Sequence, residues 1–135
     1  MIHNARSLES LSINKNGETD PTHMYTEFQM AVVFPYQLTN LLKVFGSLRN
    51  VIFISSIYGV VGPNKTLYPD LDSSSPIQYG VSKAAQIHLA KELAIRLGGQ
   101  GIRVNTVSFG GLKGRAPKDF VERYQKLTPM GGMME

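Results

Sequence analysis

Three polar residues, Ser56, Tyr79 and Lys83, have the types and the spacing for acid–base chemistry. Tyr79 and Lys83 are four residues apart, so in a helix their side chains share one face. A tyrosine hydroxyl ordinarily has a pKa near 10, and an ammonium about 4 Å away stabilises a phenolate by up to roughly 4 kcal/mol, or about three pK units. Such a tyrosine can act as a general acid or base near neutral pH. With Ser56 holding a substrate oxygen, the chemistry that fits is proton transfer at a hydroxyl or carbonyl coupled to hydride transfer.

The elements that must position these residues are two strands and the helix between them. Residues 51–55, VIFIS, form a continuous apolar run that is typical of a strand buried on both faces. Residues 75–78 have the spacing of a capping box, and the helix that starts there ends at the glycines 98–99. Residues 102–107, IRVNTV, predict the second strand. Strand, helix and strand form a right-handed βαβ crossover, so the predicted fold class is α/β with a parallel sheet. The helix stripe expected to face the core is Val81, Ala84, Ala85, Leu89, Leu93 and Leu97.

The first part of the chain predicts another helix. Asp20 and Pro21 supply an N-cap side chain and a proline at the first helical position. Pro35 lies inside the helical pattern and is expected to kink or interrupt it, and Gly46 ends it. A loop at 58–75 and a short helix at 118–126 complete the elements. The apolar residues at helical spacing are Met24, Phe28, Ala31, Val32, Leu38, Leu41, Leu42 and Phe45.

Composition bounds the class of protein. The 135 residues are enough for one domain, and 42% apolar with 18% charged residues is typical of a globular chain. The absence of cysteine excludes disulfides and thiolate metal sites. The net charge of +4 has its densest basic run at Lys113, Arg115 and Lys118, without interleaved aromatic residues, so a nucleic-acid partner is disfavoured. No run is long enough to span a membrane and no signal peptide is visible, so we expect a cytoplasmic protein.

Three segments in this order, IFISSIYG, YGVSKAA and IRVNTVSFGG, resemble the short-chain dehydrogenase/reductase family. The segments around Asn4 and at TPMGGM (128–133) are similar to further family segments, so the resemblance covers nearly the whole chain. It implies a Rossmann-like doubly wound parallel sheet of three layers, α/β/α. It also implies an oxidoreductase that uses NAD or NADP on an alcohol/carbonyl pair, with a small-molecule substrate and a homo-oligomeric assembly, a dimer or tetramer.

The resemblance assigns roles to individual residues. Tyr79 would be the catalytic acid/base, Ser56 would orient the substrate, and Lys83 would lower the pKa of Tyr79 and hold the nicotinamide ribose. The remaining positions expected beside the cofactor are Asn4, Ala5, Phe109, Gly110 and Gly111.

The chain departs from the family pattern in several places. Ala31 stands where the family has an asparagine of a proton relay, Phe109 replaces a proline and Arg6 replaces a glycine. Ser56 and Tyr79 are unusually far apart, so residues 57–78 are expected to form an insertion over the active-site mouth, as a lid or a substrate-recognition loop. SIYGVVGP is similar to sugar-modifying family members of surface-glycan and flagellin-glycan pathways, which makes a sugar derivative the suggested substrate.

The family's opening strand, glycine-rich turn and helix, which bind the dinucleotide pyrophosphate, have no counterpart in the sequence. We therefore expect residues 1–135 to form a single partial domain, the catalytic half of a protein about twice as long. Such a domain would have an open parallel edge and uncovered apolar helix faces. One hypothesis is an enzyme. An alternative is a catalytically incomplete scaffold or assembly subunit, or a fragment of a longer enzyme. A nucleic-acid binder, which rests on the pI, is a distant third.

Overall fold

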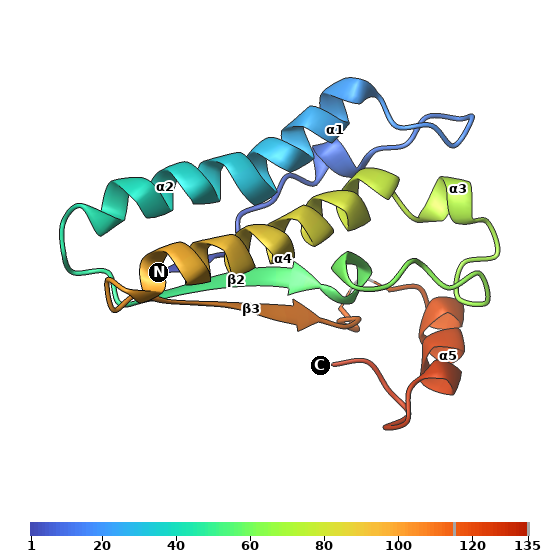
Figure 1. The fold of residues 1–135 in the computed structure, drawn as a ribbon. Coiled ribbons are helices and arrows are strands. Elements are labelled where there is room, and N and C mark those ends of the chain that lie inside the picture. Colours follow the sequence, from blue (N-terminus) through green and yellow to red (C-terminus); the bar gives the residue numbers. More distant parts are fainter. Residues whose placement is uncertain (115, 135) are drawn as a thin grey trace.

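The computed structural model describes residues 1–114 and 116–134 as a three-stranded parallel sheet with helices on one face (Figure 1). Arg115 of the basic run lies outside the described residues. The strands are β1 (Ile2–His3), β2 (Asn50–Ser56) and β3 (Arg103–Phe109), and the helices are α1 (Pro21–Phe28), α2 (Phe34–Lys43), α3 (Leu71–Ser74), α4 (Ile77–Gly98) and α5 (Lys118–Leu127). Short turns of other helix types are η1 (Glu9–Leu11), η2 (Gln29–Val33) and η3 (Ile57–Gly59).

The strand order explains why the connecting helices share a face. The strands lie side by side in chain order, β1-β2-β3, and pair in parallel. Right-handed crossovers that progress in one direction place every connecting helix on the same side of the sheet, and Figure 1 shows α1, α2 and α4 there. The expected α/β class and parallel sheet are confirmed. The described residues supply the sheet and one helix layer of the doubly wound arrangement.

The core lies between α4 and the sheet, and it occupies the half of α4 nearer its carboxyl end. Val51 and Phe53 of β2 are fully buried against it. The parallel register places Val51 beside Val104 of β3, so the two strands present one continuous apolar surface to the helix. The buried cluster consists of Leu48, Val51, Phe53, Ala90, Leu93, Leu97, Ile102 and Val104.

The start of α4 differs from the sequence prediction. The helix begins at Ile77 with Pro76 at the N-cap, and no side chain caps it, so the predicted capping box is wrong. The Gln78 amide instead donates to the Ser10 and Ser12 carbonyls and accepts from the Thr19 hydroxyl. Gln78 is therefore bonded to residues distant in the sequence and not to the serine three positions before it. These bonds join the loop after β1 to the first turn of α4.

The buried face of α4 also differs from the predicted stripe. Leu93 and Leu97 are buried as predicted, whereas Val81 and Ala84 are exposed. The first half of the helix buries a polar face against the sheet and α1. The residues of that face are Gln78, Ser82, Lys83 and Gln86.

Helices α1 and α2 form one nearly continuous rod (Figure 1). Asp20 caps it at Thr22, as predicted. The expected interruption at Pro35 takes the form of the wider π-helical turn η2, which precedes the proline and accommodates its missing N–H. Gly46 has a φ of +67°, in the left-handed region, and ends the segment. Of the predicted apolar residues at helical spacing, Ala31 is buried, whereas the others are intermediate or exposed. The buried face consists of Glu27, Ala31, Pro35 and Thr39, four residues apart each time.

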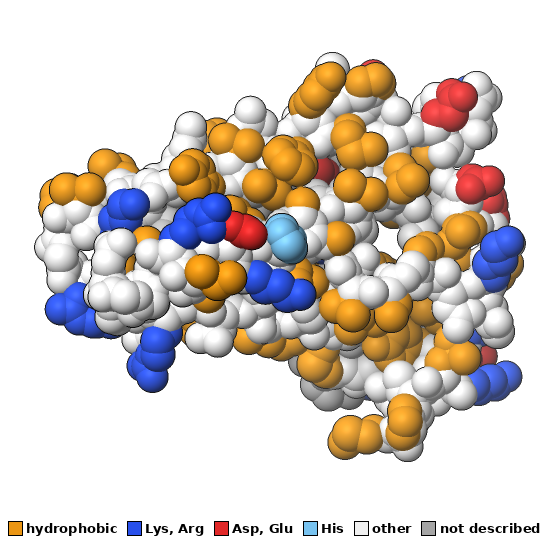
Figure 2. Space-filling view, in the orientation of Figure 1, with side chains coloured by type: hydrophobic (Ala, Val, Ile, Leu, Met, Phe, Trp, Pro, Cys, Tyr) orange, Lys and Arg blue, Asp and Glu red, His pale blue; other side chains and the backbone are white. Residues whose placement is uncertain are grey.

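The sheet edge and the outer helix faces expose apolar side chains. Ile2 of the edge strand β1 is 65% exposed, as expected for a strand with a single neighbour. Figure 2 shows hydrophobic side chains spread over the helix side of the molecule. The exposed apolar residues of α1 to α2 include Phe28, Phe34, Leu38 and Leu41. Of the helices described, none is long and apolar enough to cross a membrane.

Candidate active site

A cavity of about 320 Å³ opens where β2 and β3 end. Segments that are distant in the sequence meet there: the loop after β1, the ends of both strands, the first turns of α4, and α5. The carboxyl ends of parallel strands are where open α/β sheets bind ligands. Seven of the eight sequence-predicted site residues line this cavity: Asn4, Ser56, Tyr79, Lys83, Phe109, Gly110 and Gly111.

Ala5, the eighth predicted residue, lies elsewhere. It lines a different cavity, of about 570 Å³, along β1 and α2. Asn4 contributes to both cavities and so stands between them. The structure therefore brings Asn4, but not Ala5, to the space that holds Tyr79.

Lys83 is buried, and its ammonium has fixed partners. Nζ donates to the carbonyl of Ile54 at 2.9 Å and lies 3.4 Å from Oε1 of Gln86. It is 5.8 Å from the centroid of the Tyr79 ring, as expected for residues one helical turn apart. Burial lowers the pKa of Lys83; the Glu27 carboxylate raises it, and the Arg6 guanidinium lowers it further. Burial removes water from the Lys83 ammonium, which is unfavourable. The Ile54 carbonyl, the Gln86 side chain and the Glu27 carboxylate partly offset this cost.

The two adjacent serines have different environments. The Ser55 hydroxyl donates to the backbone carbonyl of Lys83 at 3.1 Å, which joins β2 to α4. The Ser56 hydroxyl accepts from the backbone N–H of Tyr58 at 3.2 Å. Among the described residues it has no acceptor for its own proton, so it can donate into the cavity. This difference supports Ser56, rather than Ser55, as the residue that faces a substrate.

Arg6 is a site residue that the sequence did not identify as functional. Its guanidinium carbon lies 5.6 Å from the centroid of the Tyr79 ring, so two cations, Arg6 and Lys83, flank that tyrosine. The sequence marked Arg6 only as a replacement for glycine. Its charge, directly after the predicted cofactor-binding residues Asn4 and Ala5, was the feature from which the sequence could have predicted a functional role.

Aromatic residues form the outer wall of the cavity. The hydroxyls of Tyr58 and Tyr68 are hydrogen-bonded at 2.7 Å, and the Tyr68 ring packs on Phe120 of α5 with centroids 5.3 Å apart. Burial, followed by the hydrogen bond between Tyr58 and Tyr68, raises the pKa of Tyr58. Tyr58 and Tyr68 both belong to the segment 57–78, which the sequence predicted to be an active-site insertion.

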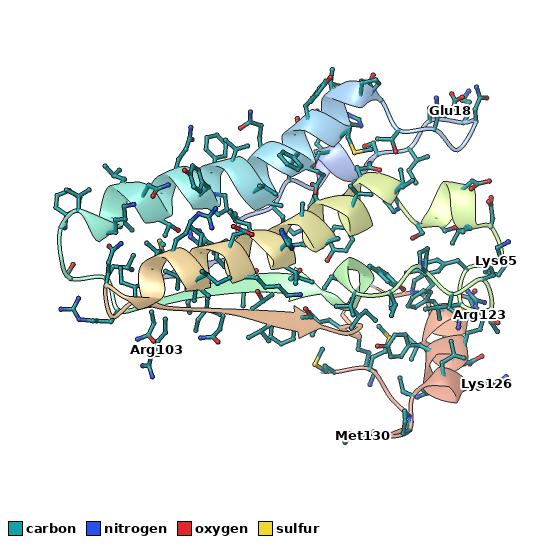
Figure 3. The ribbon with its side chains drawn as sticks, viewed as in Figure 1. Glu18, Lys65, Arg103, Arg123, Lys126 and Met130 are labelled. Carbon is teal, nitrogen blue, oxygen red and sulfur yellow. The ribbon has the colours of Figure 1, made fainter. Side chains whose placement is uncertain are left out.

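Helix α5 is fastened to this wall by two adjacent residues near its middle, Arg123 and Tyr124. Arg123 lies where α5 approaches the loop that carries Lys65 (Figure 3), and its Nε donates to the Leu67 carbonyl at 3.0 Å. Tyr124 accepts from the backbone N–H of Gly111 at 2.8 Å. A Cβ on Gly111 would lie 2.6 Å from the Met133 methyl group and 3.0 Å from the Tyr124 ring, so a larger residue there would require both side chains to shift.

A parallel α/β sheet with a serine, a tyrosine and a lysine at its carboxyl edge defines the class of Rossmann-like oxidoreductases. Comparison with known proteins gives the family. Residues 44–134 match the family model described as "Enoyl-(Acyl carrier protein) reductase". The chain belongs to the short-chain dehydrogenase/reductase family, as its motifs predicted.

Individual relatives are 30–37% identical to the chain over the aligned residues. It is 37% identical over 89 residues to the Post-translational flagellin modification protein A of Campylobacter coli, covering 66% of this chain and 35% of that protein. The Uncharacterized oxidoreductase YmfI of Bacillus subtilis (strain 168) is also 37% identical over 89 residues, covering 62% and 32%. A short-chain dehydrogenase of Leptospira borgpetersenii, solved with bound NAD+, matches with a TM-score of 0.74 and 30% identity, covering 84% and 44%. The chain thus spans about a third of the length of these curated relatives.

Proposed function

We propose that the chain carries the catalytic residues of an NAD(P)-dependent oxidoreductase that acts on an alcohol/carbonyl pair. The supporting observation is the convergence of Ser56, Tyr79 and Lys83 at one cavity, although they come from a strand end and a helix separated by 23 positions (79 − 56). The solved relative with bound NAD+ supports a nicotinamide cofactor. The hydroxyls and carboxamide of such a cofactor match the polar groups of Asn4, Tyr79 and Lys83 that line the same cavity.

In this proposal each residue has one task. Ser56 donates a hydrogen bond to the substrate oxygen and orients it. Tyr79 gives its hydroxyl proton to that oxygen when a carbonyl is reduced, and takes the proton back when an alcohol is oxidised. Lys83 holds a positive charge one helical turn from Tyr79 and binds ribose hydroxyls. When bound, the nicotinamide donates or accepts the hydride at the carbon that carries this oxygen.

Binding of NADH and of NADPH to the purified chain tests the proposal, with Lys83→Ala compared with Lys91→Ala. Lys91 is exposed on the same helix, so it controls for loss of charge. Calorimetric titration should show binding that Lys83→Ala weakens about tenfold or more, because a hydrogen bond to a charged group contributes about 1.5–3 kcal/mol. Equal affinities in all three proteins would contradict it. No binding of either cofactor by a folded chain would favour the alternative of a non-catalytic assembly subunit.

A sugar derivative is the substrate that we propose, in line with the relative named for flagellin modification. The aromatic wall of Tyr58, Tyr68 and Phe120 supports this choice because it combines flat apolar ring faces with hydroxyls, which suits a polyhydroxylated ring. The insertion 57–78 would then recognise the substrate. Tyr68→Leu should raise KM for a sugar-derivative carbonyl substrate and leave NADH affinity unchanged. An unchanged KM would count against this role.

We further propose that copies of the chain associate through α4. Support comes from Val81, 50% exposed, and Ile95, 79% exposed, which lie on its outer surface. Light scattering behind a sizing column would then report a dimer or tetramer, and Val81→Lys with Ile95→Lys should shift it toward monomer.

A further inference from the structure

Glu27 on α1 is a buried acid that the proposed reaction does not use. Its side chain is 3% exposed. Its carboxylate accepts hydrogen bonds from two hydroxyls, Ser10 of η1 and Ser82 of α4, the second at 3.4 Å. Both donors are neutral, and among the described residues no ion pair reaches this carboxylate. A buried carboxylate is costly unless a positive charge compensates it.

The compensating charge lies on the helix that Glu27 packs against. Lys83 follows Ser82 directly on α4, and its pKa is raised by Glu27 against the larger lowering effect of burial. The other groups that face the Lys83 ammonium are the Ile54 carbonyl, Gln86, the Tyr79 ring and the cationic Arg6. Of these groups none is an acid, so Glu27 supplies the negative charge on this side of α4.

We propose that Glu27 is a positioning residue of the candidate active site, whose buried carboxylate stabilises the Lys83 ammonium beside Tyr79. The catalytic meaning of this role rests on the proposed function, but the electrostatic link does not. Glu27 acts through Lys83 and touches neither the substrate nor the cofactor. Two cations, Lys83 and Arg6, flank the Tyr79 ring, and Glu27 is the one buried carboxylate among the described residues.

The hydrogen bonds of Glu27 also fix its position relative to the site. Ser10, which donates to one carboxylate oxygen, is held through its own carbonyl by Gln78, one residue before Tyr79. The Ser82 hydroxyl, three residues after Tyr79, shares its single proton between the other carboxylate oxygen at 3.4 Å and the Tyr79 carbonyl at 3.0 Å. The carboxylate is therefore tied to the two turns of α4 that carry Tyr79 and Lys83.

Titration of Lys83 in the chain without cofactor tests the link. Lysines are converted to ¹³C-dimethyllysine, the Lys83 signal is assigned with Lys83→Arg, and its shift is followed with pH by NMR. In Glu27→Gln the proton affinity of Lys83 should fall about tenfold, that is by about one pK unit, because a nearby opposite charge is removed. Glu9→Gln is the matched control, since Glu9 is an exposed acid of the neighbouring η1 and its removal should leave the Lys83 titration unchanged.

Glu27→Leu repeats the test with a side chain that needs no hydrogen bond, and Glu27→Asp should restore part of the proton affinity. Thermal unfolding shows which variants are folded. A single folded variant without the charge, either Glu27→Gln or Glu27→Leu, is sufficient for the test. A Lys83 titration that is the same in the wild type and in a folded neutral variant would overturn the inference. Because the measurement uses neither cofactor nor substrate, failure of the proposed function would leave this result standing, and the reverse also holds.

Discussion

The Ser55 side chain is bonded to the backbone of Lys83, and the Lys83 side chain is bonded to the backbone of the residue before Ser55. The Ser55 hydroxyl donates to the Lys83 carbonyl at 3.1 Å, and the Lys83 ammonium donates to the carbonyl of Ile54, the neighbour of Ser55, at 2.9 Å. Strand β2 and helix α4 are thus bonded to each other at the point where their polar residues enter the site. Both Ser55 and Ser56 line the cavity, but the proton of Ser55 is used in this link between β2 and α4.

Replacing the two serines should therefore have opposite consequences. Ser55→Ala leaves the Lys83 carbonyl without this donor and should lower the free energy of unfolding by about 1–2 kcal/mol. Ser56→Ala should change stability by less than about 0.5 kcal/mol and reduce turnover of a carbonyl substrate about 10²-fold or more. Urea unfolding and steady-state rates of the two variants check this. Equal effects on turnover would contradict the assignment of Ser56.

A pair of glycines in the segment 57–78 tests how closely η3 packs on α4. A Cβ on Gly59 would lie 2.7 Å from the backbone carbon of Lys83, whereas nothing lies within 4 Å of one on Gly62. Gly59→Ala should thus displace η3 from α4 and cost about 1–3 kcal/mol, while Gly62→Ala should be neutral or slightly stabilising. Thermal unfolding measures both. A Gly59→Ala variant as stable as Gly62→Ala would show that the two elements do not approach so closely.

Stability should depend on pH through His3. Its ring donates to Thr39 Oγ1, because that hydroxyl gives its own proton to the Pro35 carbonyl, and it stacks on Phe53 at 4.8 Å. Burial, and then the positive N-terminus, lower the pKa of His3. The unfolded chain therefore binds a proton at a higher pH than the folded chain does. Neutral His3 contributes its full share to the free energy of unfolding above the ordinary histidine pKa of about 6.5. This contribution is lost as the pH falls from there through the lowered pKa of His3 in the folded chain.

Urea unfolding between pH 7.5 and pH 5.5 measures this dependence. The wild type should lose stability over that range, and His3→Gln should show a flatter profile. His88→Gln is the control, since His88 is exposed on α4. A wild-type profile that His3→Gln reproduces would exclude His3 as its source.

The sequence by itself determined the elements and most of the site. Asp20 and Pro21 mark a helix start, the apolar run at 51–55 marks a buried strand, and glycines 98–99 end a helix, because each of these signals is local to the backbone. The order of the motifs also placed Ser56, Tyr79 and Lys83 at one sheet edge. That inference needs only the parallel strand order, which the sequence pattern predicts.

The tertiary structure alone decided which face of each helix is buried. The predicted apolar stripes of α1, α2 and the first half of α4 are largely exposed, and Glu27, Gln78 and Lys83 are buried instead. The spacing of apolar residues does not predict the burial of these polar side chains, because a prediction from spacing places polar groups in water. Here the hydroxyls and carbonyls of other segments satisfy the buried polar groups, so the energetic cost of burial is removed by partners distant in the sequence. For the same reason the sequence did not identify Arg6, which lies beside Tyr79, or Glu27, which acts on Lys83. Both are found only in the tertiary structure.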